Sequence, residues 1–165
     1  MTVLSATSSP SPSTENDPIR SDHRRDRQYL AMGERYAEAA TRLSRCGSIG
    51  GVCEPFLMLV AHALELSLKA VLSHQGHDEE RLMAIGHSLE CCHRQAVKGG
   101  FHPKDRTGLA ILVEALDQPH AFQAFRYPQI LGWTLPDTTR VIAPLVDHLE
   151  AVKLLLDTTD RPTRE

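Results

Sequence analysis

The stretch that decides the fold is EPFLMLVAHALELSLKAVLSHQG, residues 54–76. Glu54 followed by Pro55 is typical of the first turn of a helix, and Gly76 is typical of the position just beyond a helix end. Between them the apolar residues lie on almost every side of the helix, so little of its surface can face solvent. We therefore expect a helix at the centre of a helical bundle.

Two charged residues, Glu65 and Lys69, interrupt this apolar helix. They are four residues apart with the acid first, a spacing and order that allow an ion pair on one helix face. A pair buried among other helices is costly unless further hydrogen bonds satisfy it. His87 or Arg126 could supply those bonds.

The composition predicts a single all-α domain. The chain has 165 residues, of which 41% are hydrophobic and 5% aromatic, and it contains few runs of β-branched residues. We expect an up-and-down bundle of four to five helices, with a long ordered loop before the last helix. The bundle should cover residues 23–158, between a disordered tail (1–22) rich in Ser and Pro and a short C-terminal tail (159–165).

The remaining helices follow from apolar spacing and from their end signals. The expected ranges are 24–45, 87–98, 105–118 and 137–158. Pro119 should close the helix at 105–118, and Pro144 should kink the last helix. Residues 119–136 contain aromatic residues and no helical period, so we expect an ordered loop, with a small hairpin as one form of it.

Charge and cysteine content limit the environment of the protein. The net charge is −3, from 18 basic and 21 acidic residues, so no global field attracts nucleic acid or anionic lipid. The four cysteines lack the spacing of a zinc knuckle or a disulfide framework. No segment of the sequence reaches the eighteen consecutive apolar residues that a membrane span needs. We expect a cytoplasmic protein with reduced thiols and no membrane partner.

Three short segments resemble those of a known superfamily. ALELSLKAVL lies on the central helix, GHSL opens the next helix, and FRYP lies in the loop before the last helix. Together they resemble the HEPN superfamily, small helical bundles of prokaryotic defence, toxin and stress systems. The resemblance covers roughly residues 24–158.

The resemblance implies a bundle of four or five helices, commonly homodimeric, whose best-known members cleave RNA. Active members carry an arginine and a histidine four to six residues apart, with a polar residue after the arginine, near the start of the last helix. Here that helix offers Arg140 and His148, with seven residues between them and Pro144 within the interval. Arg81 and His87 have an allowed gap, but they lie before the third helix. The sequence therefore departs from the ribonuclease pattern.

The candidate site consists of five residues that coincide with the resemblance. The catalytic candidates are Glu65, His87 and Arg126, and the candidates for substrate binding are Lys69 and Tyr127. Arg126 would hold a phosphate, His87 would transfer a proton near neutral pH, and Glu65 would orient one of them. The structural alternative is that His87 caps the third helix, Glu65 pairs with Lys69 or Arg126, and Tyr127 packs over both.

A metal site is a weaker interpretation of the sequence. Glu90 and His93 have the three-residue spacing that diiron bundles use, but no second such pair occurs. His74 and His77 should lie in an exposed, solvated turn. We therefore expect no metal and no cofactor. Adjacent Cys91 and Cys92 should be a helix-flank residue and a buried small hydrophobe, respectively.

Two functional hypotheses follow. The first is a HEPN-like module that associates with RNA or a nucleotide in a bacterial stress, toxin or defence system. By this resemblance it would be a homodimer, with an operon-encoded protein as a further partner. In that hypothesis ribonuclease activity is possible without the usual motif. The alternative is a non-catalytic dimerisation or scaffold module with a purely structural polar cluster.

Overall fold

The computed structural model describes residues 18–46, 49–127 and 136–159. Within these ranges the chain forms six α-helices and two short 3₁₀ helices. The α-helices are α1 (Pro18–Arg45), α2 (Cys53–His74), α3 (Glu79–Ile85), α4 (Leu89–Lys98), α5 (Arg106–Ala121) and α6 (Ile142–Thr159). The 3₁₀ helices are η1 (Ile49–Gly51) and η2 (Thr138–Arg140). The predicted all-α bundle is confirmed.

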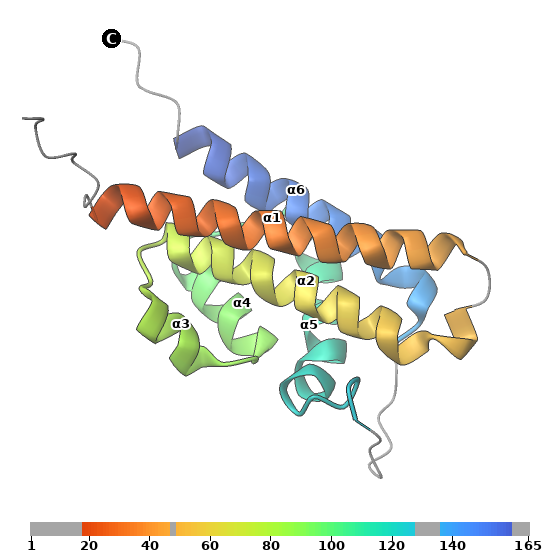
Figure 1. The fold of residues 1–165 in the computed structure, drawn as a ribbon. Helices are drawn as coiled ribbons and strands as arrows, with labels where there is room; N and C mark the ends of the chain where they lie inside the picture. Colours follow the sequence, from red (N-terminus) through yellow and green to blue (C-terminus); the bar gives the residue numbers. More distant parts are fainter. Residues whose placement is uncertain (1–17, 47–48, 128–135, 160–165) are drawn as a thin grey trace, which may run out of the picture.

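Helix α2 is the centre of the bundle, as its sequence predicts. Figure 1 shows the long pair α1 and α2 side by side, α6 next to α1, and α4 and α5 on the other side of α2. The described residues of α2 from Ala63 to Ser73 are all buried. By length and a mean hydropathy of 1.6 this helix could cross a membrane, but 78% of that window is buried in the bundle, as in the core helix of a soluble protein.

Helices α1 and α2 contact each other closely at a glycine. Gly33 is buried, and a β-carbon added there would lie 3.1 Å from the carbonyl oxygen of Ala63. The missing side chain therefore lets the two backbones approach each other. Leu30, Ala37 and Ala40 continue the buried stripe of α1 on either side.

Two features of the N-terminal half of the chain differ from those predicted. Helix α1 begins at Pro18, inside the expected tail, while residues 1–17 lie outside the described ranges. Helix α3 occupies residues that lie between the predicted second and third helices, where we expected no helix. Its cause is local: the Asp78 side chain accepts a hydrogen bond from Arg81 N, and Leu82 is fully buried.

Pro119 does not end its helix. Helix α5 continues to Ala121, and Phe122 N still donates to the carbonyl oxygen of Gln118 at 3.0 Å. A proline removes only its own N–H bond, so one further turn forms around it. The expected loop therefore starts later, at a turn that includes Gln123 in the left-handed region (φ 57°). Residues 128–135, on which the possible hairpin falls, lie outside the described part of the chain.

The last helix starts later than predicted. Asp137 caps η2, through bonds from Thr139, and α6 begins only at Ile142. Pro144 is then in the first turn of α6, where its missing N–H has no acceptor within the helix. The expected kink therefore has no cause. The apolar spacing of this segment predicts a buried stripe. Its buried residues in the structure are Val141, Leu145, Leu149, Val152 and Leu156, whereas Val146 is exposed.

Candidate functional site

The candidate site is built around the Glu65 carboxylate in the middle of α2. The residue is 2% exposed, and its Oε1 accepts a hydrogen bond from Lys69 Nζ at 2.7 Å. Lys69 is itself buried, so the pair is shielded from water. The predicted pair on one face of the helix is confirmed.

Three histidines surround the same carboxylate. His120 Nε2, in the last turn of α5, lies 2.7 Å from Oε2, and His87 Nδ1 lies 3.1 Å from Oε2 and 3.2 Å from Oε1. His62 Nδ1, one turn before Glu65, lies 3.6 Å from Oε2, too far for a hydrogen bond. A carboxylate can only accept hydrogen bonds, so the bonded nitrogens of His87 and His120 carry protons. The Glu65 cluster, as we name it, comprises Glu65, Lys69, His62, His87 and His120.

The cluster determines the ionisation of Glu65. Burial by itself raises the pKa of this carboxyl, but the contacts with His120, His62 and Lys69 lower its pKa well below the usual range. Glu65 is therefore a carboxylate throughout the physiological range. It is a poor general base, because its electron pairs are engaged by positive or proton-donating groups.

One member of the cluster reaches the surface. The His87 side chain is 42% exposed, whereas those of His62, Lys69 and His120 are 22%, 11% and 3% exposed. His87 follows Gly86, which adopts a positive φ of 66° after α3. This turn directs the chain back so that His87 bonds to α2. The surface of the cluster is therefore its His87 edge.

The structure does not bring Arg126 and Tyr127 to the cluster. Both are exposed, Tyr127 by 62%, at the end of the turn that follows α5. The expected bond from Arg126 to Glu65 is supplied instead by His120, which lies six residues earlier on α5. The predictions that Arg126 joins the site and that Tyr127 packs over it are therefore wrong.

The expected hydrogen bond between His87 and Glu65 is present, but the capping role that we expected for His87 is wrong. Ser88 is the residue that caps α4, with its Oγ accepting a bond from Cys91 N at 3.1 Å. The Ser88 hydroxyl also donates to Asp117 on α5, as does Glu90 N. The start of α4 is thus fixed to α5 by Asp117, and His87 is left to bond to Glu65.

Two members of the cluster, His62 and His120, were not predicted from the sequence. His62 is three residues before Glu65, a spacing that places both on one helix face, so periodicity could have found it. Its ring packs edge-on against Tyr36 with a centroid separation of 4.5 Å. His120 gave no comparable signal, because the proline before it indicated a loop. Its position depends on the extra turn of α5.

The Arg140 and His148 pair does not form a site. His148 is 1% exposed, and its Nε2 donates to Ser67 Oγ at 2.9 Å inside the core. Burial, with the nearby charge of His93, lowers the pKa of His148 to about 3. The Arg140 side chain is 86% exposed, on η2. A buried neutral histidine and a remote exposed arginine cannot share a phosphate.

The cysteines match their predicted roles, and two further histidines do not. Cys92 is fully buried, with burial raising its pKa to about 12, while Cys91 is half-buried. His74, expected in a solvated turn, instead lies 2.9 Å from the buried Asp26 carboxylate. Its neighbour His77 bonds to Gln95 at 3.1 Å. These contacts connect the end of α2 to α1 and α4.

Among the described residues, one group has the geometry to hold a metal ion. The ligand atoms of His62, Glu65 and His120 all lie within 4.8 Å of one another. This group is different from the Glu90 and His93 pair considered above, which lies on α4.

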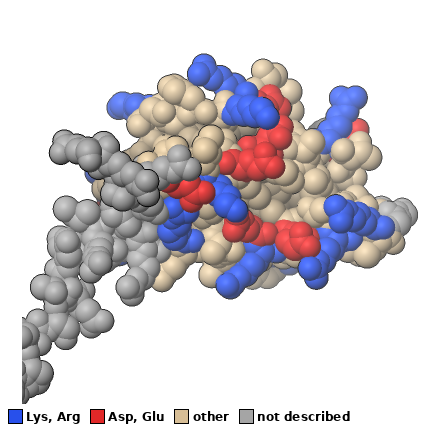
Figure 2. Space-filling model, turned by 90° about the horizontal axis from the view of Figure 1, so that it is seen from above, with Lys and Arg blue, Asp and Glu red and all other residues tan. Residues whose placement is uncertain are grey.

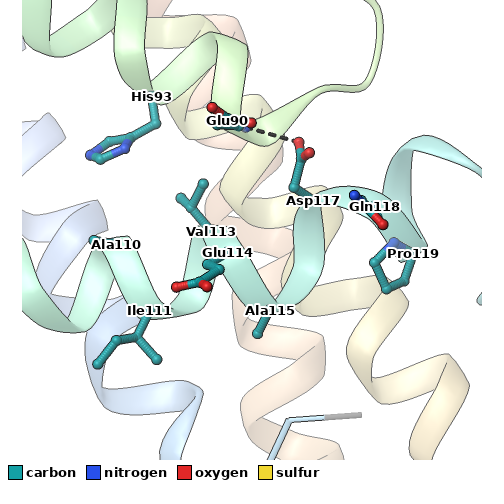
Figure 3. Close-up of a pocket in the computed structure, with 10 residues that line it drawn as sticks. All are labelled: Glu90, His93, Ala110, Ile111, Val113, Glu114, Ala115, Asp117, Gln118 and Pro119. Atoms are coloured by element: carbon teal, nitrogen blue, oxygen red, sulfur yellow. Dashed lines mark hydrogen bonds between the residues drawn. The ribbon is translucent and has the colours of Figure 1, made fainter. Parts of the chain in front are cut away.

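That pair lines an open groove between α4 and α5 (Figure 3). The groove has a volume of about 710 Å³, and its lining includes the acids Glu90, Glu114 and Asp117. Among the described residues that line it there is no Lys or Arg. An acidic groove repels phosphate. On the face shown in Figure 2, basic and acidic side chains alternate rather than gather in one patch.

Comparison of the chain with protein-family models, with curated proteins and with solved structures gives no match. The resemblance to HEPN bundles therefore depends on the quoted residues and on the helical architecture alone.

Proposed function

We propose that the chain is a HEPN-like helical module that acts by binding a partner rather than by catalysis, in a bacterial stress, toxin or defence system. The observation that supports this proposal is the saturation of Glu65 by Lys69, His87 and His120. The three donors come from α2, from the turn before α4 and from α5. The cluster thus links the elements of the bundle, which is an architectural role.

The position of the arginines supports the same proposal. Cleavage of RNA requires a cation at the phosphate and a base within reach of the attacking group. Arg126 and Arg140 are exposed away from the Glu65 cluster, and His148 lies in the core. The groove between α4 and α5 is acidic. The described residues therefore lack the arrangement that the nuclease members of the superfamily use.

The proposed module works as a homodimer in the cytoplasm, with an operon-encoded protein as a further partner. Large apolar side chains on the surface of α3, of α5 and of the turn after α5 provide the contact area: Met83, Ile111, Phe122 and Tyr127 are each more than 60% exposed. Ile111 lies on the outer face of α5, at the groove of Figure 3, beside the small side chain of Ala110. An exposed apolar side chain of this size suits burial against a second copy of the chain.

Sedimentation velocity of the purified chain tests the dimer. The wild type should sediment as a dimer, and Ile111→Asp should shift it to the monomer, because the substitution buries an unpaired charge in the interface. Leu154→Asp is the matched control, an equally exposed leucine on α6, and should leave the dimer unchanged. A monomeric wild type at all accessible concentrations would contradict the proposal.

A second candidate function is association with RNA or a nucleotide, with the Glu65–His87 pair as its reactive part. The observation in its favour is the half-exposed imidazole of His87, bonded to a buried carboxylate. A carboxylate that orients a histidine is a common element of acid–base catalysis.

Incubation with total cellular RNA distinguishes the two functions. The comparison is between the wild type and a His87→Ala, Arg126→Ala double variant that is folded by circular dichroism. Cleavage by the wild type alone supports an atypical ribonuclease. Absence of cleavage by either protein supports the binding module.

A further inference from the structure

We propose that His62, Glu65 and His120, with His87, form a binding site for a zinc ion. The first three present ligand atoms within 4.8 Å of one another, from neighbouring turns of α2 and from the end of α5. The fourth ligand is His87 Nδ1, 3.1 Å from the same carboxylate oxygen. Three imidazoles and one carboxylate are a ligand set that Zn²⁺ accepts in tetrahedral geometry.

The two oxygens of Glu65 have different surroundings, and this division supports the site. Oε1 accepts from Lys69 at 2.7 Å, which fixes the orientation of the carboxylate. Oε2 is the oxygen that faces all three histidines, at 2.7, 3.1 and 3.6 Å. An ion bound through Oε2 would therefore leave the Lys69 bond intact. Hydrogen bonds of this kind to the far side of a ligand commonly orient it.

His62 provides the second observation. Its Nδ1 is buried and has no hydrogen-bond partner among the described residues, although it points to Oε2. A buried polar atom without a partner is costly, and nearly all such atoms are satisfied in native proteins. A metal ion would satisfy this nitrogen through its lone pair.

The geometry requires only small movements. Ligands of a tetrahedral zinc at its usual bond lengths lie roughly 3.4 Å apart. The present separations among the ligand atoms of His62, Glu65 and His120 range from 2.7 Å to at most 4.8 Å, and rotation of the histidine side chains can bring them to this value. On binding, the protons that His87 and His120 now direct at Glu65 move to the other ring nitrogen or are released.

The chemistry of the donors selects against hard cations. Mg²⁺ and Ca²⁺ prefer oxygen ligands throughout, whereas this site offers one oxygen and three nitrogens. The charge of Lys69 opposes that of the ion and weakens its binding. We therefore expect Zn²⁺ and Co²⁺ to bind and Mg²⁺ not to bind.

Titration with Co²⁺ tests the site. The chain is first treated with a chelator and dialysed, and Co²⁺ is then added in steps. Binding should produce the visible d–d absorption of tetrahedral Co²⁺, saturating at a single equivalent per chain, and Zn²⁺ should abolish it by displacement. The melting temperature should rise with Zn²⁺ and not with Mg²⁺. Absence of both the absorption and the Zn²⁺-dependent rise would overturn the proposal.

Variants identify the ligands. His62→Phe keeps an aromatic ring against Tyr36 and removes a nitrogen that has no hydrogen bond, so its metal-free melting temperature should stay close to that of the wild type. Its affinity for Co²⁺ should fall at least about tenfold. Glu65→Gln, which keeps the side-chain shape, should also weaken binding.

His77→Gln is the control, since it removes a histidine from the turn that follows the same helix, away from the cluster. It should bind Co²⁺ like the wild type. Binding that survives in His62→Phe and is lost in His77→Gln would place the ion at the end of α2 and would overturn the assignment.

Discussion

His120 Nε2 donates a hydrogen bond of 2.7 Å to Glu65 Oε2, between two residues that are 55 positions apart in the sequence. Both side chains are 3% exposed. This bond joins the end of α5 to the middle of α2, and it fixes the helix that carries Asp117, the residue that holds the start of α4. Each prediction below concerns a contact of this kind, or a residue that lacks one.

Substitution of His120 tests the bond itself. His120→Ala should lower the free energy of unfolding by about 2 kcal/mol, because it removes a buried hydrogen bond to a charged group. Urea denaturation followed by circular dichroism measures the loss. His93→Ala, at a half-buried histidine on α4 outside the cluster, is the control. Equal losses in both variants would show that the bond to Glu65 has no special weight.

A double-variant cycle tests the buried pair on α2. Lys69→Met should cost about 3 kcal/mol, because Glu65 keeps its charge and loses a donor. The Glu65→Leu, Lys69→Met double variant should be more stable than the sum of the single losses indicates, since no charge is then left unpaired. The free energies of unfolding of the four proteins give the coupling. Strictly additive losses would rule out an energetic link between the two side chains.

The acid sensitivity of the fold should depend on His148. Its pKa is about 3 in the folded chain, against an ordinary value of 6.5. Between these values the unfolded chain binds a proton that the folded chain does not, so stability falls as the pH falls from about 6.5 towards 3.

For His148 alone, the free energy of unfolding should change by about 1.4 kcal/mol per pH unit in this range. Denaturation at several pH values measures the slope. It should be shallower in His148→Gln and unchanged in His102→Gln, at an exposed histidine. An identical slope in wild type and His148→Gln would contradict the role assigned to His148.

The contact of α1 with α2 predicts the effect of a larger residue at Gly33. A β-carbon added at position 33 would lie only 3.1 Å from a backbone oxygen of Ala63. Gly33→Val should therefore lower the free energy of unfolding by about 1–3 kcal/mol through overpacking. Ala39→Val, on the exposed side of α1, should cost no more than about 0.7 kcal/mol, its loss in helix propensity. Thermal denaturation of the two variants gives the comparison. A more stable Gly33→Val variant would show that the helices can separate at this point without loss.

Arg126 should be dispensable for stability. Its side chain is exposed after α5, so Arg126→Ala should change the free energy of unfolding by no more than about 0.5 kcal/mol. Had Arg126 been the partner of Glu65, the same substitution would have left a buried charge without its donor. Urea denaturation separates these outcomes, and a loss as large as that of His120→Ala would mean that Arg126 reaches the cluster in solution.

The sequence by itself determined the features that depend on local periodicity. The apolar run from Phe56 to Leu72 and the glycine at position 76 defined the central helix, and the spacing of Glu65 and Lys69 defined their pair. These predictions succeed because the helix repeat fixes which side chains share a face, whatever the rest of the chain does.

Tertiary structure alone decided which distant side chains complete the cluster. His120 and Arg126 are six residues apart in the sequence. The extra turn of α5 beyond Pro119 brings His120 to Glu65 and leaves Arg126 exposed to solvent. Such convergence depends on how several helices pack and where each one ends. Because small shifts of a helix end rotate the following side chains by about 100° per residue, no local pattern could select between the two.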